Sequence, residues 1–156
     1  MRVAGIAVEI PSSGRPAARL VVLDDAGGSP SIEVHEDYPS AKVAIAEQLH
    51  DQAEAVRSRL KGLRVDRVVI RRADQPPKAS NMEGPRRRLL AEGALTGAAR
   101  SVVVDTRIGT GKQTGEWFGS SKSDVDKTAK QLLDADQVHA RYVEATSAAL
   151  AGLALP

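Results

Sequence analysis

The chain has no cysteine and few aromatic residues. Aromatic side chains make up 3 % of the 156 positions. Without cysteine there is no disulfide framework, no thiolate nucleophile and no zinc site built on cysteine. The scarcity of aromatics predicts a core of Ala, Val, Leu and Ile, and it argues against a single-strand-binding surface made of stacking aromatic platforms.

Long apolar runs are also missing. None approaches the ~20 residues that a bilayer-spanning helix needs, and the apolar start at 1–10 reads as a strand rather than a signal peptide. We therefore expect a cytoplasmic protein. The net charge of +2 neither requires nor excludes a nucleic-acid partner, so local clusters of charge must decide.

The apolar pattern predicts one α/β domain covering residues 1–156, with the element order β-β-β-α-β-α-β-α-α. Strands are expected at 2–10, 18–23, 31–36, 65–70 and 101–105, and helices at 45–63, 85–99, from 123 onward and from 136 onward. A meander followed by alternating helix and strand indicates a five-stranded mixed sheet flanked by helices.

Several local signals refine this outline. Gly93 and Gly97 are expected to let the second helix pack very close to the sheet. Ser123 with Asp126 resembles a capping box. The segment 106–120 is predicted to be a mobile glycine-rich loop, and its GTGK stretch lacks the remaining positions of a phosphate-binding loop.

Three stretches resemble RuvC-type Holliday-junction resolvases, which have the ribonuclease H-like fold. "RVAGIAVEI" is similar to their first strand, "VDRVVIRR" to their fourth strand, and "SKSDVDKTAKQLL" to the lysine-bearing helix before the last catalytic helix. Closer still, the chain resembles a small bacterial family of uncharacterised RuvC-like proteins. The resemblance implies a ribonuclease H-like, RuvC-like fold, and it also implies that a homodimer is an option.

The resemblance further implies where the nuclease acids should be. Such nucleases gather three or four carboxylates around two magnesium ions held ~3.5–4 Å apart. The first-strand acid falls on Ala7, the fourth-strand acid on Arg71, and the two helix acids on Arg141 and Glu144. Because one acid in this set remains, the expected active site is degenerate.

Relocated carboxylates offer an alternative site. Glu9 shares a strand face with Ala7, Asp74 follows Arg71, and Asp105 is expected to end the fifth strand at the same edge of the sheet. Together with Glu144 they are weak candidates for a magnesium-dependent nuclease site. Without that alternative we expect no catalytic residue, no metal and no cofactor.

Basic residues form a second candidate site. If the loop after the fourth strand folds back over the carboxyl end of the sheet, they form a basic rim suited to phosphate groups. The members are Arg71, Arg72, Lys78, Arg86, Arg87, Arg88, Lys112 and Lys122.

These observations favour a pseudo-nuclease that binds DNA, RNA or an acidic protein surface through the basic rim. Enzyme activity is not the favoured interpretation; if there is any, it is that of a magnesium-dependent nuclease. A purely structural interaction module is the third interpretation. None of the three involves a membrane.

Overall fold

The computed structural model describes residues 1–74 and 82–156. Three strands come first: β1 (Arg2–Glu9), β2 (Ala17–Asp24) and β3 (Ser31–Pro39). Helix α1 (Ile45–Leu63), β4 (Arg67–Arg71), α2 (Glu83–Arg100) and β5 (Thr106–Gly109) follow. The chain continues through α3 (Gly111–Trp117), α4 (Lys122–Ala135), a short 3-10 helix η1 (Ala140–Tyr142) and α5 (Val143–Ala154).

The strands form one mixed sheet in the order β3-β2-β1-β4-β5. The pairs β1–β2 and β2–β3 are antiparallel, whereas β1–β4 and β4–β5 are parallel. The predicted α/β class with a five-stranded mixed sheet is therefore confirmed. We call the edge where β1, β4 and β5 end the carboxyl edge of the sheet.

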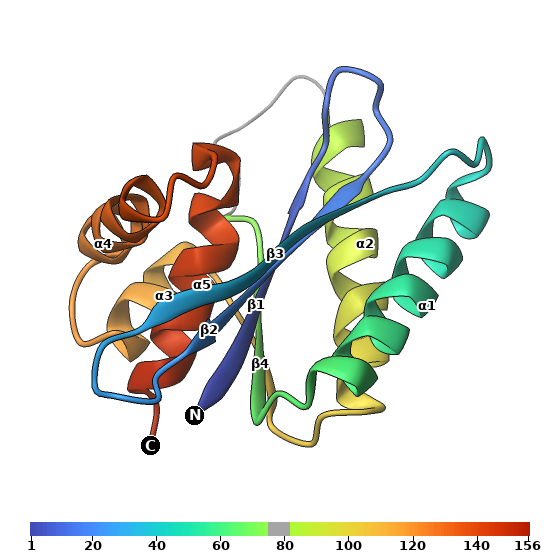
Figure 1. Ribbon diagram of the computed structural model, residues 1–156. Coiled ribbons are helices and arrows are strands. Elements are labelled where there is room, and N and C mark those ends of the chain that lie inside the picture. The colour runs from blue at the N-terminus through green and yellow to red at the C-terminus, as the bar shows by residue number, and fades with distance from the viewer. Residues whose placement is uncertain (75–81) are drawn as a thin grey trace.

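Helices cover both faces of the sheet, as Figure 1 shows: α1 and α2 lie on one side, and α3, α4 and α5 lie on the other. Alternation along β1 explains the two cores. Ala4, Ile6 and Val8 face α1 and α2, while Val3 and Ala7 face α4 and α5. Among the described residues no helix is both long and apolar enough to cross a membrane.

Close packing against the sheet occurs at Gly5 rather than at the two glycines of α2. A Cβ on Gly5 would lie 1.9 Å from the carbonyl oxygen of Ala145 in α5, so only glycine fits this position. The space around Gly93 and Gly97 is open. The expectation for those two was wrong because α2 buries the face that carries Ala91, Leu95 and Ala99.

The last strand lies later in the chain than predicted. The apolar run 101–105 forms the turn that follows α2, in which the N–H of Val103 donates to the carbonyl of Ala99. Pairing with β4 starts at Thr106. Residues 106–120, predicted to be a loop, instead contain β5 and α3. Thr110 caps α3 through a reciprocal capping box with Gln113.

The last two helices also begin at other residues than predicted. Ser121, not Ser123, caps α4, and its reciprocal partner is Asp124 rather than Asp126. Asp136 ends α4 instead of capping the last helix, and α5 begins at Val143 after η1. The shift frees Asp126 for a different contact at the carboxyl edge.

Candidate functional site

Ala7 lies between two arginines at the carboxyl edge. It pairs in register with Arg71 on β4 and with Arg19 on β2. Its side chain faces α5, which is the face on which an acid would have to lie. Two cationic side chains therefore flank the position where the resemblance places the first metal-binding carboxylate.

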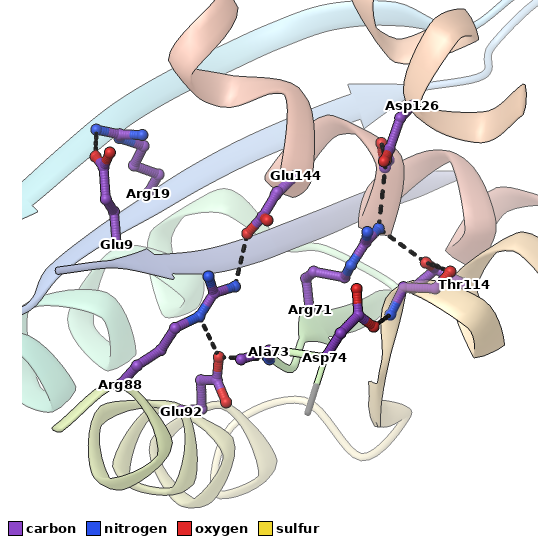
Figure 2. Close-up of polar contacts among 12 residues, drawn as sticks. Glu9, Arg19, Arg71, Ala73, Asp74, Arg88, Glu92, Thr114, Asp126 and Glu144 are labelled. Atoms are coloured by element: carbon purple, nitrogen blue, oxygen red, sulfur yellow. Dashed lines mark hydrogen bonds and ion pairs between the residues drawn. The ribbon is translucent and has the colours of Figure 1, made fainter. Parts of the chain in front are cut away.

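Arg71 is buried, with 1 % of its surface exposed. Its Nη1 donates to Thr114 Oγ1 at 2.9 Å and lies 3.4 Å from Asp126 Oδ1 (Figure 2). Ser147 on α5 donates to the same Asp126 oxygen at 2.7 Å. The guanidinium thus links β4 to α3 and α4 and, through Asp126, to α5.

The space around Arg71 is tight. A Cβ on Gly111 would lie 2.5 Å from Arg71 Nη2, so glycine at the start of α3 lets the guanidinium fit. Nη2 is buried and has no hydrogen-bond partner among the described residues. An unpaired buried donor costs free energy, which the contacts at Nη1 must offset.

Asp74 lies beside this cluster and contacts α3 and α4. It accepts hydrogen bonds from the Gly111 N–H at 2.9 Å and from Lys122 Nζ at 2.5 Å. Partial burial acts to raise the pKa of Asp74, but the Lys122 ammonium and the Gly111 N–H outweigh it and hold that pKa below its usual value. Asp74 is therefore a paired anion that joins the end of β4 to two helices.

Arg88 on α2 connects two carboxylates. Its Nε donates to Glu92 at 2.8 Å and its Nη2 donates to Glu144 at 2.6 Å (Figure 2). Glu92 is fully buried and also accepts the Ala73 N–H at 2.8 Å. Burial raises the pKa of Glu92 even though Arg88 and the Ala73 N–H act in the opposite direction.

The remaining acid near Ala7 is also paired. Glu9 forms an ion pair with Arg19, whose Nη1 donates to the carbonyl oxygen of Arg141 at 2.8 Å. Asp37 on β3 lies 2.7 Å from Arg141 and 3.5 Å from Arg19. Glu9 therefore ends a network that runs across β1, β2 and β3.

Three adjoining hollows form what we call the edge groove. The first, of about 240 Å³, is lined by Ala7, Val8, Glu9, Arg19, Arg88, Ala140, Arg141, Val143 and Glu144. The second, of about 400 Å³, shares Glu9 and Arg88 with it. The third, of about 240 Å³, shares Ala73, Asp74 and Pro85 with the second and adds Arg72 and Arg86. The shared residues join the hollows along the carboxyl edge.

The four candidate carboxylates do not form one cluster. Asp105 precedes β5 at the opposite end of the sheet, where it contacts Arg67 at 2.5 Å and Arg107 at 3.0 Å. The expected position at the carboxyl edge was wrong because the strand starts after Asp105 rather than ending at it. Glu9, Asp74 and Glu144 each pair with a different cation.

A pair of divalent cations needs several oxygen ligands at one point. Within residues 1–74 and 82–156, no group of three or more His, Asp or Glu side chains is arranged so that it could hold a metal ion. With Ala7 and Arg71 at the two strand positions, the donor set does not fit a two-metal centre.

The residues of the predicted basic rim have different surroundings. Arg71 is internal, Arg88 and Lys122 are in ion pairs, and Lys112 lies 3.8 Å from Glu116. Arg87 pairs with Glu83 at 3.0 Å and also donates to the Gly14 carbonyl. Lys78 lies outside the described residues. Among the described residues, the exposed side chains of Arg72 and Arg86 have no hydrogen-bond or ion-pair partner.

Sequence reasoning missed four residues of this site: Arg19, Glu92, Thr114 and Asp126. Arg19 could have been found, because a charged residue opposite Ala7 in a meander faces the same side as Ala7. Glu92 follows Arg88 by one helical turn, which is a signal for an ion pair. The contacts of Thr114 and Asp126 had no sequence signal, since they depend on how α3 and α4 fold back onto β4.

The layered arrangement and strand order are those of the ribonuclease H-like fold as found in RuvC resolvases. The Thermus thermophilus RuvC structure matches with a TM-score of 0.70 and 18 % identity, over 99 % of this chain and 94 % of that one. T. thermophilus RuvC in complex with a Holliday junction substrate matches with a TM-score of 0.70 and 17 % identity, over 99 % and 93 % of the two chains. No protein-family model and no curated protein sequence matches the chain. The structural likeness confirms the RuvC-like fold predicted from the three sequence stretches.

Proposed function

We propose that this chain is a RuvC-like pseudo-nuclease that binds nucleic acid along the edge groove and does not cleave it. The observation that carries the proposal is the placement of arginines around Ala7. Arg19 and Arg71 flank it in register, and Arg88 and Arg141 line the same hollow. A two-metal centre needs carboxylates in that place, so these arginines argue against cleavage. Guanidinium groups suit phosphate oxygens where they are accessible, which in the edge groove applies to Arg72 and Arg86.

The arginines of the edge groove differ in whether they are already in ion pairs. Arg88 is fixed by Glu92 and Glu144, which orients its guanidinium but neutralises much of its charge. Arg72 and Arg86 line the third hollow with no partner in the described part of the chain. We therefore assign most of the affinity for phosphate to Arg72 and Arg86, with Arg88 as a positioned contact.

The structural neighbour bound to a Holliday junction supports the kind of ligand to test first. The fold is shared, and the carboxyl edge is the place where arginines are gathered in this chain. Branched DNA, linear duplex and single strand of equal length are the probes. Whether the ligand is DNA or RNA is decided by adding an RNA duplex and an RNA strand to the set.

The experiment is fluorescence anisotropy with labelled probes across a series of NaCl concentrations. The double variant Arg72→Glu/Arg86→Glu should bind more weakly and lower the salt slope by about two, one for each lost phosphate contact. Lys61→Glu/Arg100→Glu, with the same charge change at exposed helix positions away from the groove, is the matched control. Equal weakening by both pairs, or no weakening, would contradict the assignment of the phosphate contacts to Arg72 and Arg86. No weakening together with a co-purifying protein would favour a module that binds another protein.

The homodimer and the cytoplasmic location stay predictions. A homodimer is tested by sedimentation equilibrium, and a cytoplasmic location by fractionation of the source cells. Cleavage of any probe in Mg²⁺ that disappears in Glu144→Ala would instead support the nuclease with relocated carboxylates.

A further inference from the structure

A fourth hollow lies between α2 and β5, next to the edge groove. It has a volume of about 470 Å³ and is lined by Arg72, Leu89, Gly93, Ile108 and Gln113. We call it the α2–β5 hollow. It meets the edge groove at Arg72 and Leu89 and extends away from the carboxyl edge along α2.

Its two large apolar side chains are exposed. Leu89 has 56 % and Ile108 39 % of its surface in contact with solvent. Gly93, one turn after Leu89 on α2, has open space where a side chain would be. Covering such apolar surface is favourable, by about 25 cal/mol per Å². An apolar side chain from a partner would fit between Leu89 and Ile108, above Gly93.

The strand beside the hollow has a free edge. Among residues 1–74 and 82–156, β5 is the last strand in the sheet and pairs with β4 alone. The N–H of Val68 donates to the carbonyl of Asp105, and the N–H of Arg72 donates to the carbonyl of Gly109. Backbone groups alternate along a parallel strand, so those of Arg107 also face β4, and the N–H and C=O of Ile108 point to the free edge. An extended chain can pair there.

The charge at the hollow has one sign. Arg72 has no partner among the described residues, and none of the described residues that line the hollow is acidic. A carboxylate from a partner would therefore find an available guanidinium at one end. The described lining includes two aliphatic side chains and no aromatic ring on which a nucleobase would stack, so it favours a peptide side chain over a base.

We propose that the α2–β5 hollow binds an extended acidic peptide segment of a partner protein. One aliphatic or phenylalanine side chain of the peptide lies between Leu89 and Ile108, a neighbouring carboxylate pairs with Arg72, and the peptide backbone adds to the free edge of β5 at Ile108. This interaction does not depend on the nucleic-acid function proposed above.

The test is selection of random dodecapeptides displayed on phage against the wild-type protein. Selected peptides are then synthesised with a fluorophore and titrated with purified variants. The expected peptides carry Asp or Glu next to one apolar residue. Leu89→Ser and Arg72→Glu should each weaken binding at least tenfold. Leu90→Ser is the matched control, because Leu90 is 55 % exposed on the same helix but does not line the hollow.

Three results would overturn the proposal. The first is a selection that enriches no peptide. The second is a set of selected peptides that bind Leu89→Ser as tightly as wild type. The third is a sedimentation result in which wild type is a dimer and Leu89→Ser a monomer, which would make a second copy of the chain the occupant. Ile108 lines the α2–β5 hollow but not the edge groove. Ile108→Ser should weaken peptide binding and leave the affinity for DNA within twofold of wild type, so failure of this proposal and failure of the nucleic-acid proposal are distinguishable.

Discussion

Ala7 and Arg71 are direct register partners on the parallel strands β1 and β4. In a nuclease of this fold the resemblance places an acid at each of these two positions. Here one position is a methyl group and the other is a buried guanidinium that contacts Thr114 and Asp126. An internal cation therefore lies at the carboxyl edge, and it fastens α3 and α4 to the sheet.

Replacing Arg71 tests that structural role. Arg71→Met keeps a long apolar side chain but leaves Asp126 and the buried Thr114 without their cation. We expect the free energy of unfolding to fall by about 1.5–3 kcal/mol, the usual cost of losing hydrogen bonds that involve a charged group. Urea denaturation of Arg71→Met, Asp126→Asn and the double variant measures it. Additive effects of the two substitutions would contradict a direct interaction.

The substitution Gly5→Ala tests whether α5 packs as close to β1 as described. A Cβ in Gly5→Ala would overlap backbone atoms of Ala145 and Ala149, neither of which can move independently. We expect a loss of about 3 kcal/mol or more in stability. Gly97→Ala, in open space on α2, is the comparison and should raise stability by up to about 1 kcal/mol. Similar melting temperatures for both variants would show that α5 does not pack as described.

The raised pKa of Glu92 predicts that the free energy of unfolding decreases as pH rises. Burial raises its folded-state pKa above the ordinary value of 4.5, so the folded protein holds this proton to a higher pH than the unfolded chain does. Stability should therefore decrease as pH rises from 4.5 through the folded-state pKa. Glu92→Gln removes this slope, as urea titrations at a series of pH values would show. Glu54→Gln, at an exposed ion pair on α1, is the control.

The lowered pKa of Asp74 predicts the opposite pH dependence, with the free energy of unfolding decreasing as pH falls. Its folded-state pKa lies below the ordinary value of 3.8, so its stabilising effect is present above pH 3.8 and is lost as pH falls through the folded-state pKa. Asp74→Asn should be less stable than wild type near neutral pH and should lose less stability on acidification. An unchanged acid limb of the stability curve would mean that the contacts with Lys122 and Gly111 do not persist in solution.

Much of the fold could be predicted from the sequence because its periodicity is strong. The apolar run in β2, the alternation in β3 and the helical spacing in α1 identify these elements directly, and the three RuvC-like stretches identify the fold. The last strand was mispredicted because an apolar run in the sequence does not form a strand in the structure. The sequence around Val102 and Val103 is typical of a strand. In the structure these residues form the turn after α2, where their N–H groups donate to the carbonyl of Ala99, and they pack against the core.

The site was only partly predictable. The absence of acids at Ala7 and Arg71 is visible in the sequence, and so are the arginines of α2. The sequence does not show which cations are already paired. Lys122 and Arg88 each pair with a carboxylate through tertiary contacts, whereas Arg72 and Arg86 have no such partner in the part of the chain that the structure describes. Asp105 was misplaced because its position depended on the boundary of β5.

The most direct test of the account compares binding and cleavage of a labelled four-way DNA junction in EDTA and in Mg²⁺. We predict the same affinity in both solutions once ionic strength is matched, weaker binding by Arg72→Glu/Arg86→Glu, and an intact probe throughout. Cleavage in Mg²⁺ that is lost in Glu144→Ala would contradict the account.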